Sequence, residues 1–157
     1  MKLNSVLTLL FIALFTACKG GAYDLSGYGL KPDTGENASP LIAKALQEIA
    51  AEVNFDTVRI LLPKGRYDFY PEGASKREYF ISNHDQDNPK LVGLAFENMK
   101  NVIFDGQGSE LVFHGRMLPV SLVGSENCTL KNFSIDFANP HISQVKVLEL
   151  SLIHISE

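Results

Sequence analysis

The sequence predicts an all-β fold of the solenoid type, with one helix covering one end. Between residues 93 and 140, short strands of alternating polarity restart at near-regular intervals, and each ends at Asn or Gly. Residues 100–104 (KNVIF) align with residues 126–130 (ENCTL), an offset of 26. Self-similarity at a period in the twenties, built from strands, is typical of stacked coils that present a long groove.

A single segment, residues 39–53, shows clear helical periodicity, and it follows a turn-rich stretch at residues 23–38. Ser39 is a candidate N-cap, and Pro40 suits the first turn. Because one amphipathic helix cannot bury its own apolar face, we expect it to cover the open end of the strand coil. That face would consist of Ile42, Ala45, Leu46, Ile49 and Val53.

The middle of the chain predicts further strands at residues 58–62, around Tyr67 and Phe69, and at residues 79–82. Polar loops are expected at residues 71–77 and 83–89.

Within the repeats, alternate residues should face a common interior, because side chains on a strand alternate between its two faces. The bends fall at asparagine, which tolerates left-handed backbone angles. A β-sandwich is the alternative, but its hairpins favour Asn-Gly or Asp-Gly turns, and Asp105-Gly106 is the one such pair. The expected inward pairs are Val102 and Phe104, Leu111 and Phe113, Cys128 and Leu130, and Ile135 and Phe137.

The formal net charge of the 157-residue chain is −4. This argues against nucleic acid as a partner, since phosphates require a basic surface. It suits a neutral partner such as a sugar.

The N-terminus resembles a bacterial export signal. Lys2 precedes a short apolar run at residues 6–15, which is too short to span a bilayer. Residues 15–18 (FTAC) then resemble a lipobox, so we expect a signal peptide at residues 1–17 and lipid attachment at Cys18. A short tether at residues 18–22 would follow, on an exported lipoprotein of the periplasm or outer membrane. With Cys18 acylated, Cys128 has no disulfide partner and is expected to be a small buried hydrophobe.

Four segments together resemble the N-terminal part of pectin-lyase-like, right-handed parallel β-helix proteins, which are mostly carbohydrate-active enzymes. They are a Gly- and Asp-containing opening, a capping helix, a V-x-I-x-L-P-x-G-x-Y segment and N-V-x-F-D-G-x-G-S. In this chain they stand at residues 29–38, 39–53, 58–67 and 101–109.

A closer resemblance lies in residues 79–90 (YFISNHDQDNPK), 104–119 (FDGQGSELVFHGRMLP) and 127–137 (NCTLKNFSIDF). These are similar to glycoside hydrolase family 110, the α-1,3-galactosidases of Bacteroidetes. The resemblance implies an exo-acting enzyme that removes terminal α-1,3-linked galactose from blood-group-B-like glycans. It also implies inversion at the anomeric centre, no cofactor and no metal.

An inverting glycosidase needs a carboxylic acid and a carboxylate about 6.5–9.5 Å apart. No such pair is evident in the sequence, and the resemblance places the catalytic carboxylates in later coils. Asp136 lies between Ile135 and Phe137 and should project outward, where it could line a groove, although a solvated surface position is the commoner role. Asp105 is expected to shape a turn.

Residues 84–87 (HDQD) lack the convergent ligands that a metal site needs, so we expect an exposed or sugar-contacting loop there. His114 and His141 are isolated in the sequence and are expected to be surface or satisfied polar residues.

The strand pattern at residues 145–150 continues without a polar cap, and residues 151–157 (SLIHISE) resemble read-through of a sequencing adaptor. We therefore expect residues 23–150 to form the N-terminal cap and first coils of a truncated β-helix, inactive as it stands. The alternatives are another β-helix polysaccharide enzyme, of the polygalacturonase or lyase type, and a non-catalytic glycan-binding β-helix at the cell surface.

Overall fold

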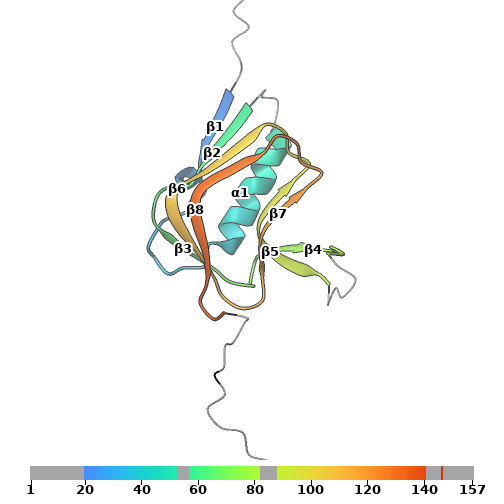
Figure 1. Cartoon of the computed structure of the whole chain (residues 1–157). Helices are drawn as coiled ribbons and strands as arrows, with labels where there is room; N and C mark the ends of the chain where they lie inside the picture. The colour runs from blue at the N-terminus through green and yellow to red at the C-terminus, as the bar shows by residue number, and fades with distance from the viewer. Residues whose placement is uncertain (1–19, 53–56, 82–87, 141–145, 147–157) are drawn as a thin grey trace, which may run out of the picture.

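The computed structural model describes residues 20–52, 57–81, 88–140 and 146. It consists mainly of strands, with one α-helix and one short 3₁₀-helix (Figure 1). In chain order the elements are β1 (Gly20–Asp24), η1 (Leu25–Tyr28), α1 (Ser39–Glu52), β2 (Thr57–Leu61), β3 (Arg66–Phe69), β4 (Ser75–Arg77), β5 (Lys90–Glu97), β6 (Val102–Phe113), β7 (Leu118–Val123) and β8 (Thr129–Phe137).

The strands form two sheets in which nearly every pairing is parallel. One sheet has the order β1-β2-β6-β3, with β8 also paired to β6, and the other has the order β4-β5-β7. Phe104 in β6 lies opposite Leu130 in β8, and Phe96 in β5 lies opposite Leu122 in β7. Both pairs are separated by 26 residues in sequence. The predicted all-β class and the 26-residue repeat are therefore confirmed as mostly parallel sheets with matching register.

The interior is lined by phenylalanine side chains stacked from strand to strand. Phe69 and Phe113 have ring centroids 4.7 Å apart, and Phe113 and Phe137 5.9 Å apart. Edge-to-face contacts at 5.6 and 5.7 Å join Phe104 to Phe96 and to Phe133. The predicted inward residues Val102, Phe104, Leu111 and Phe113 are all fully buried. Stacked aromatic side chains of this kind contribute both burial and specific ring contacts.

Helix α1 packs against β5 and η1, and Figure 1 shows it framed by β6 and β8 on one side and by β5 and β7 on the other. Its predicted apolar face is confirmed for Ile42, Ala45, Leu46 and Ile49, all buried, whereas Val53 lies outside the described residues.

Ser39 begins α1, but its hydroxyl does not act as the predicted N-cap. It donates to the carbonyl of Tyr70 at 2.7 Å and accepts from the Tyr70 N–H at 3.1 Å. The Asn37 side chain instead accepts the Ser39 N–H at 2.9 Å. Tyr70 follows the last residue of β3, and its backbone N–H and carbonyl both bond to the fully buried Ser39 hydroxyl. Because buried polar groups need partners, the hydroxyl is used there and not on the first turn of α1.

Asparagines occupy bends of the chain, as the sequence predicts: Asn98, Asn101 and Asn127 lie between strands, and Asn132 lies at the register shift within β8. Asn98, Asn101, Asn127 and Asn132 have φ angles of 53, 54, 52 and 59°. The Asn127 side-chain amide donates to Asn101 Oδ1 at 2.7 Å, one coil away. The bends therefore carry their own hydrogen bonds between coils.

Three predictions along the N-terminal half are wrong. Residues 75–77, expected in a polar loop, form β4, which pairs antiparallel with β5. Residues 79–81, expected to begin a strand, carry no regular structure. Residues 20–22, expected in a tether, belong to β1, which pairs parallel with β2. Backbone pairing with a neighbouring strand outweighs the side-chain pattern in β1 and β4.

Strands β7 and β8 each have one partner among the described strands. Their apolar residues Leu122, Val123 and Ile135 are 50, 44 and 43% exposed. Within the part of the chain that the structure describes, no helix has the length and apolar character needed to cross a membrane.

Gly65 should not tolerate a side chain. Its φ angle is 153°, and a Cβ there would lie 2.3 Å from Pro32 Cβ. We expect Gly65→Ala to lower the free energy of unfolding by about 1–3 kcal/mol, because a neighbouring loop must move. Gly27→Ala is the matched control, since a Cβ at Gly27 meets nothing within 4 Å. Urea denaturation measures both, and equal stability of the two variants would contradict the close approach.

Candidate functional site

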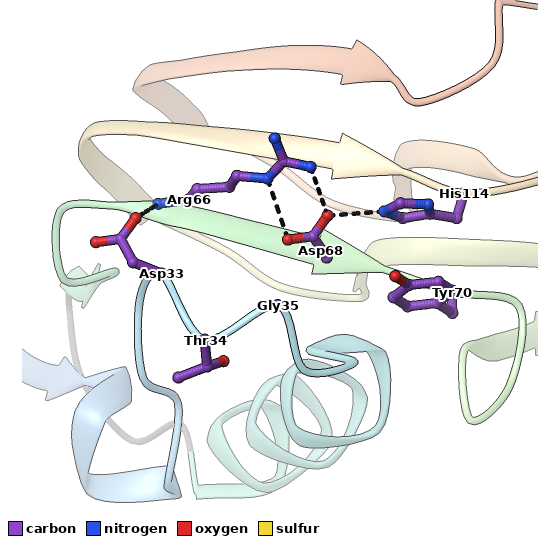
Figure 2. Close-up of a pocket in the computed structure, with 7 residues that line it drawn as sticks. All are labelled: Asp33, Thr34, Gly35, Arg66, Asp68, Tyr70 and His114. Atoms are coloured by element: carbon purple, nitrogen blue, oxygen red, sulfur yellow. Dashed lines mark hydrogen bonds and ion pairs between the residues drawn. The ribbon is translucent and has the colours of Figure 1, made fainter.

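One polar pocket of about 440 Å³ lies between the loop before α1 and the outward face of β3 (Figure 2). The loop contributes one wall, β3 and the residue after it contribute another, and the residue that follows β6 contributes a histidine. The lining residues are Asp33, Thr34, Gly35, Arg66, Asp68, Tyr70 and His114.

Hydrogen bonds to the backbone of β3 hold the loop in place. The Asp33 N–H donates to the carbonyl of Arg66 at 2.9 Å, and Asp33 Oδ1 accepts the Arg66 N–H at 2.9 Å. The Ala38 N–H donates to the carbonyl of Asp68 at 2.9 Å. Pairing at both ends fixes the loop as one wall of the pocket.

Asp68 is the centre of the site. Because side chains alternate along β3, Tyr67 and Phe69 point into the core while Arg66 and Asp68 point to the pocket. Arg66 Nε donates to Asp68 Oδ2 at 3.1 Å and Arg66 Nη2 to Asp68 Oδ1 at 2.8 Å. His114 Nε2 lies 2.7 Å from the same Oδ1. The Asp68 side chain is 7% exposed, so these bonds replace most of its hydration.

The pKa of Asp68 is lowered, first by its hydrogen bonds from Arg66 and then by the one from His114, while burial opposes the shift. Asp68 is therefore ionised at neutral pH and accepts hydrogen bonds without donating one. The group is suited to positioning its neighbours rather than to proton transfer.

An aromatic pair closes one end of the pocket. The rings of Tyr70 and His114 are stacked, with centroids 4.1 Å apart and an interplanar angle of 8°. The backbone N–H of His114 also donates to the carbonyl of Phe69 at 2.8 Å, so backbone pairing and ring stacking both fix the position of the imidazole. Figure 2 shows the Asp68 carboxylate directed at the His114 ring, with Tyr70 beneath it.

The turn between β2 and β3 is held by hydrogen bonds to the carbonyl of Pro63. The Tyr67 hydroxyl donates to the carbonyl of Pro63 at 2.7 Å, and the buried Ser109 hydroxyl donates to the same oxygen at 3.1 Å. Burial raises the pKa of Tyr67 to about 12, with the charges of Asp33 and Asp24 adding to the rise.

A second polar cluster lies on the β4-β5-β7 sheet. Arg77 Nε donates to both carboxylate oxygens of Glu97, at 2.7 and 2.8 Å. The Tyr79 hydroxyl donates to Glu97 Oε1 at 2.7 Å and lies 3.2 Å from the Ser121 hydroxyl. The hydrogen bonds from Arg77 lower the pKa of Glu97, opposed by burial and supported by Tyr79.

Among the described residues, no group of three or more His, Cys, Asp and Glu side chains is arranged to hold a metal ion. The pocket itself offers two carboxylates, and one of them is already committed to Arg66 and His114.

Comparison with known proteins points to one enzyme class, although no protein-family model matches the chain. The chain is 58% identical to an alpha-1,3-galactosidase B of Phocaeicola vulgatus over 95% of its own length and 26% of the relative. It is 59% identical to the protein of that name from Parabacteroides distasonis, over 90% of the chain and 23% of the relative. For Bacteroides fragilis the identity is 60%, over 81% of the chain and 22% of the relative.

The chain is a homologue of the alpha-1,3-galactosidases. The resemblance seen in the sequence is thereby confirmed, and the chain spans about a quarter of the length of these relatives.

Asp136, the predicted outward residue of this galactosidase homologue, is exposed on β8 opposite Val112. Its Oδ1 accepts the Phe137 N–H at 2.8 Å. It does not line the pocket, and its proposed place in a groove stays a prediction. Cys18, residues 84–87 and His141 lie outside the described residues.

Asp105 shapes a turn, as expected, since its Oδ1 accepts the Gln107 N–H at 3.0 Å and the Asn132 amide at 2.8 Å. These bonds, with a weaker contribution from Lys131, lower the pKa of Asp105. Cys128 is half-buried against the core, in agreement with its expected role as a small hydrophobe.

Sequence reasoning missed the pocket because its partners are far apart in the chain. His114 is a satisfied polar residue, as predicted, but its partner Asp68 lies 46 positions earlier. The available signal was the alternation of the polar residues Arg66 and Asp68 with the inward aromatic residues Tyr67 and Phe69.

Removing the Arg66 guanidinium should show how the contribution of Asp68 to stability depends on pH. The lowered pKa means that its contribution to stability is present above the unfolded value near 3.8 and is lost as the pH falls through the folded value. We expect Arg66→Met to lower the free energy of unfolding by about 1–3 kcal/mol near neutral pH, and by less at about pH 3. Urea denaturation at both pH values checks this.

Lys44→Met is the control, because Lys44 makes an exposed ion pair with Glu48 at 3.8 Å on α1. That pair should contribute no more than about 0.5 kcal/mol. An Arg66→Met loss that is the same at both pH values would contradict the role given to Asp68.

Proposed function

We propose that this chain is the N-terminal part of an exported exo-glycosidase that removes terminal α-1,3-linked galactose from glycans. The observation that carries the proposal is identity of 58–60% to proteins named alpha-1,3-galactosidase B. Their names favour this activity over the polygalacturonase, lyase and non-catalytic binding alternatives. A neutral glycan is the expected substrate, and the net charge of −4 supports a partner other than nucleic acid.

The proposed scaffold is a right-handed parallel β-helix, with α1 as its N-terminal cap. Parallel pairing of β5 with β7 and of β6 with β8, each one coil further along the chain, supports this architecture. The half-exposed apolar residues of β7 and β8 also support further coils stacked on that edge in the full-length protein. The relatives' greater length is consistent with such coils.

The proposed mechanism is inverting hydrolysis without a metal. A protonated carboxyl group would donate a proton to the leaving glycosidic oxygen, and a carboxylate would activate water on the opposite face of the sugar. Further coils would supply this pair. Asp136 is a candidate to line the groove, because it is exposed and projects outward from β8.

Activity is tested on the full-length protein with Galα1-3Gal as substrate. We expect release of galactose, with the β-anomer formed first as seen by proton NMR, and no loss of rate with a chelator. Galα1-4Gal and Galα1-6Glc are the controls for linkage and should remain intact. A folded full-length protein that leaves Galα1-3Gal uncleaved would overturn the proposal.

Export and anchoring are also part of the proposal, with Cys18 as the lipid-attachment residue. In cells fed an alkyne-bearing fatty acid, the wild-type chain should carry the label and enter the membrane fraction. Cys18→Ala should lose both, because a thioether-linked lipid needs that sulfur, while Cys128→Ala should retain them. Equal labelling of Cys18→Ala and the wild type would exclude anchoring at this residue.

A further inference from the structure

We infer that the pocket between loop residues 33–35 and β3 is a non-catalytic binding site for one pyranose unit of a neutral glycan. The sugar class rests on the proposed function, whereas the place and the binding mode rest on the pocket itself. The site would lie within the first coils and would add a second contact to the substrate glycan.

The polar groups of the pocket are fixed before any ligand arrives. The Arg66 guanidinium uses Nε and Nη2 on Asp68, which leaves Nη1 to donate elsewhere. Asp33 uses Oδ1 on the Arg66 backbone, which leaves Oδ2 as an acceptor. The Tyr70 hydroxyl adds a group that can do both. Donors and acceptors on a rigid frame match neighbouring sugar hydroxyls, which both donate and accept.

The charges of the pocket select against anions. Two carboxylates, Asp33 and Asp68, and one guanidinium, that of Arg66, line the pocket, so it carries a net negative charge when His114 is neutral. Protonation of His114 would bring it only to balance. Phosphate, sulfate and uronate ligands would therefore find no excess positive charge to attract them. An uncharged polyol carries no charge and does not need one.

The volume of the pocket accommodates a single sugar ring. A volume of about 440 Å³ lies within the usual range of small-molecule pockets, about 300–1,000 Å³. The stacked rings of Tyr70 and His114 provide an aromatic surface at one end, against which the C–H face of a pyranose can pack.

Binding rather than catalysis follows from the state of Asp68. Its oxygens already accept three hydrogen bonds, from Arg66 twice and from His114 once. Loss of any of them would leave a mostly buried charge less well paired. Asp68 therefore holds the other lining residues in position and does not contact the reacting bond.

The test is hydrogen–deuterium exchange of the full-length protein, followed by mass spectrometry, with methyl α-D-galactopyranoside as the probe. Saturable protection is expected in peptides covering residues 30–38 and 64–72, with a Kd of about millimolar order for so small a ligand. Tyr70→Leu should weaken that protection about tenfold, through loss of ring packing. Tyr79→Leu, in the other polar cluster, is the matched control and should retain it.

Absence of protection in these peptides, in a wild-type protein that is folded and binds the probe elsewhere, would overturn the inference. Protection by inorganic phosphate but not by the galactoside would overturn it in favour of an anion site. Galactose release without protection of these peptides would support the proposed function and contradict this binding site. Protection without galactose release would support this site and remove the proposed activity.

Discussion

Strand β6 (Val102–Phe113) sets the register on which the rest of the structure depends, because both of its edges carry parallel partners. Phe104 lies opposite Ile60 of β2 on one edge and opposite Leu130 of β8 on the other. Further along β6, Phe113 takes the same central place between Phe69 and Phe137. Side chains on these paired positions stack across three coils and form the buried aromatic core.

The same strand contains an irregularity that the fold needs. Residues 104 and 130 are 26 apart, whereas Phe113 and its partner Phe137 are 24 apart, so β6 accommodates two residues more than β8 between these points. The shift falls between Asp105 and Ser109, where Gln107 and Gly108 have φ angles of 52 and 84°. Asp105 stabilises this bend through the Gln107 N–H and the Asn132 side chain. The Asp105 carboxylate therefore links two neighbouring coils that contain different numbers of residues at this point.

The candidate pocket depends on that register. Asp68 of β3 lies opposite Val112 of β6, and His114 follows two positions later, which brings its imidazole to the Asp68 carboxylate. A slip of one residue would exchange the inward and outward faces of β3, and would bury Asp68 in place of a neighbouring aromatic residue. Core packing and the geometry of the pocket are thus fixed by one set of backbone hydrogen bonds.

The sequence could predict what depends on local pattern. Alternation predicted β2, β3 and the repeats, and helical spacing predicted α1, because one buried face imposes a period on each. Strand β4 could not be found in this way, since Ser75–Arg77 is polar and becomes a strand only through pairing with β5. The pocket was hidden for a related reason: its residues come from three segments, and only tertiary structure brings them together.

Hydrogen bonding also decides what the described carboxylates can do. An inverting glycosidase needs one carboxyl group that keeps its proton near neutral pH, which calls for an apolar, weakly paired environment. In the described part of the chain, every carboxyl group with a resolved shift has a lowered pKa: Asp24, Asp68, Glu97 and Asp105. In each case, hydrogen-bond donors that hold the side chain in place also stabilise its charged form. These four groups therefore serve as structural anions, and the general acid of the proposed reaction calls for a site with the opposite character.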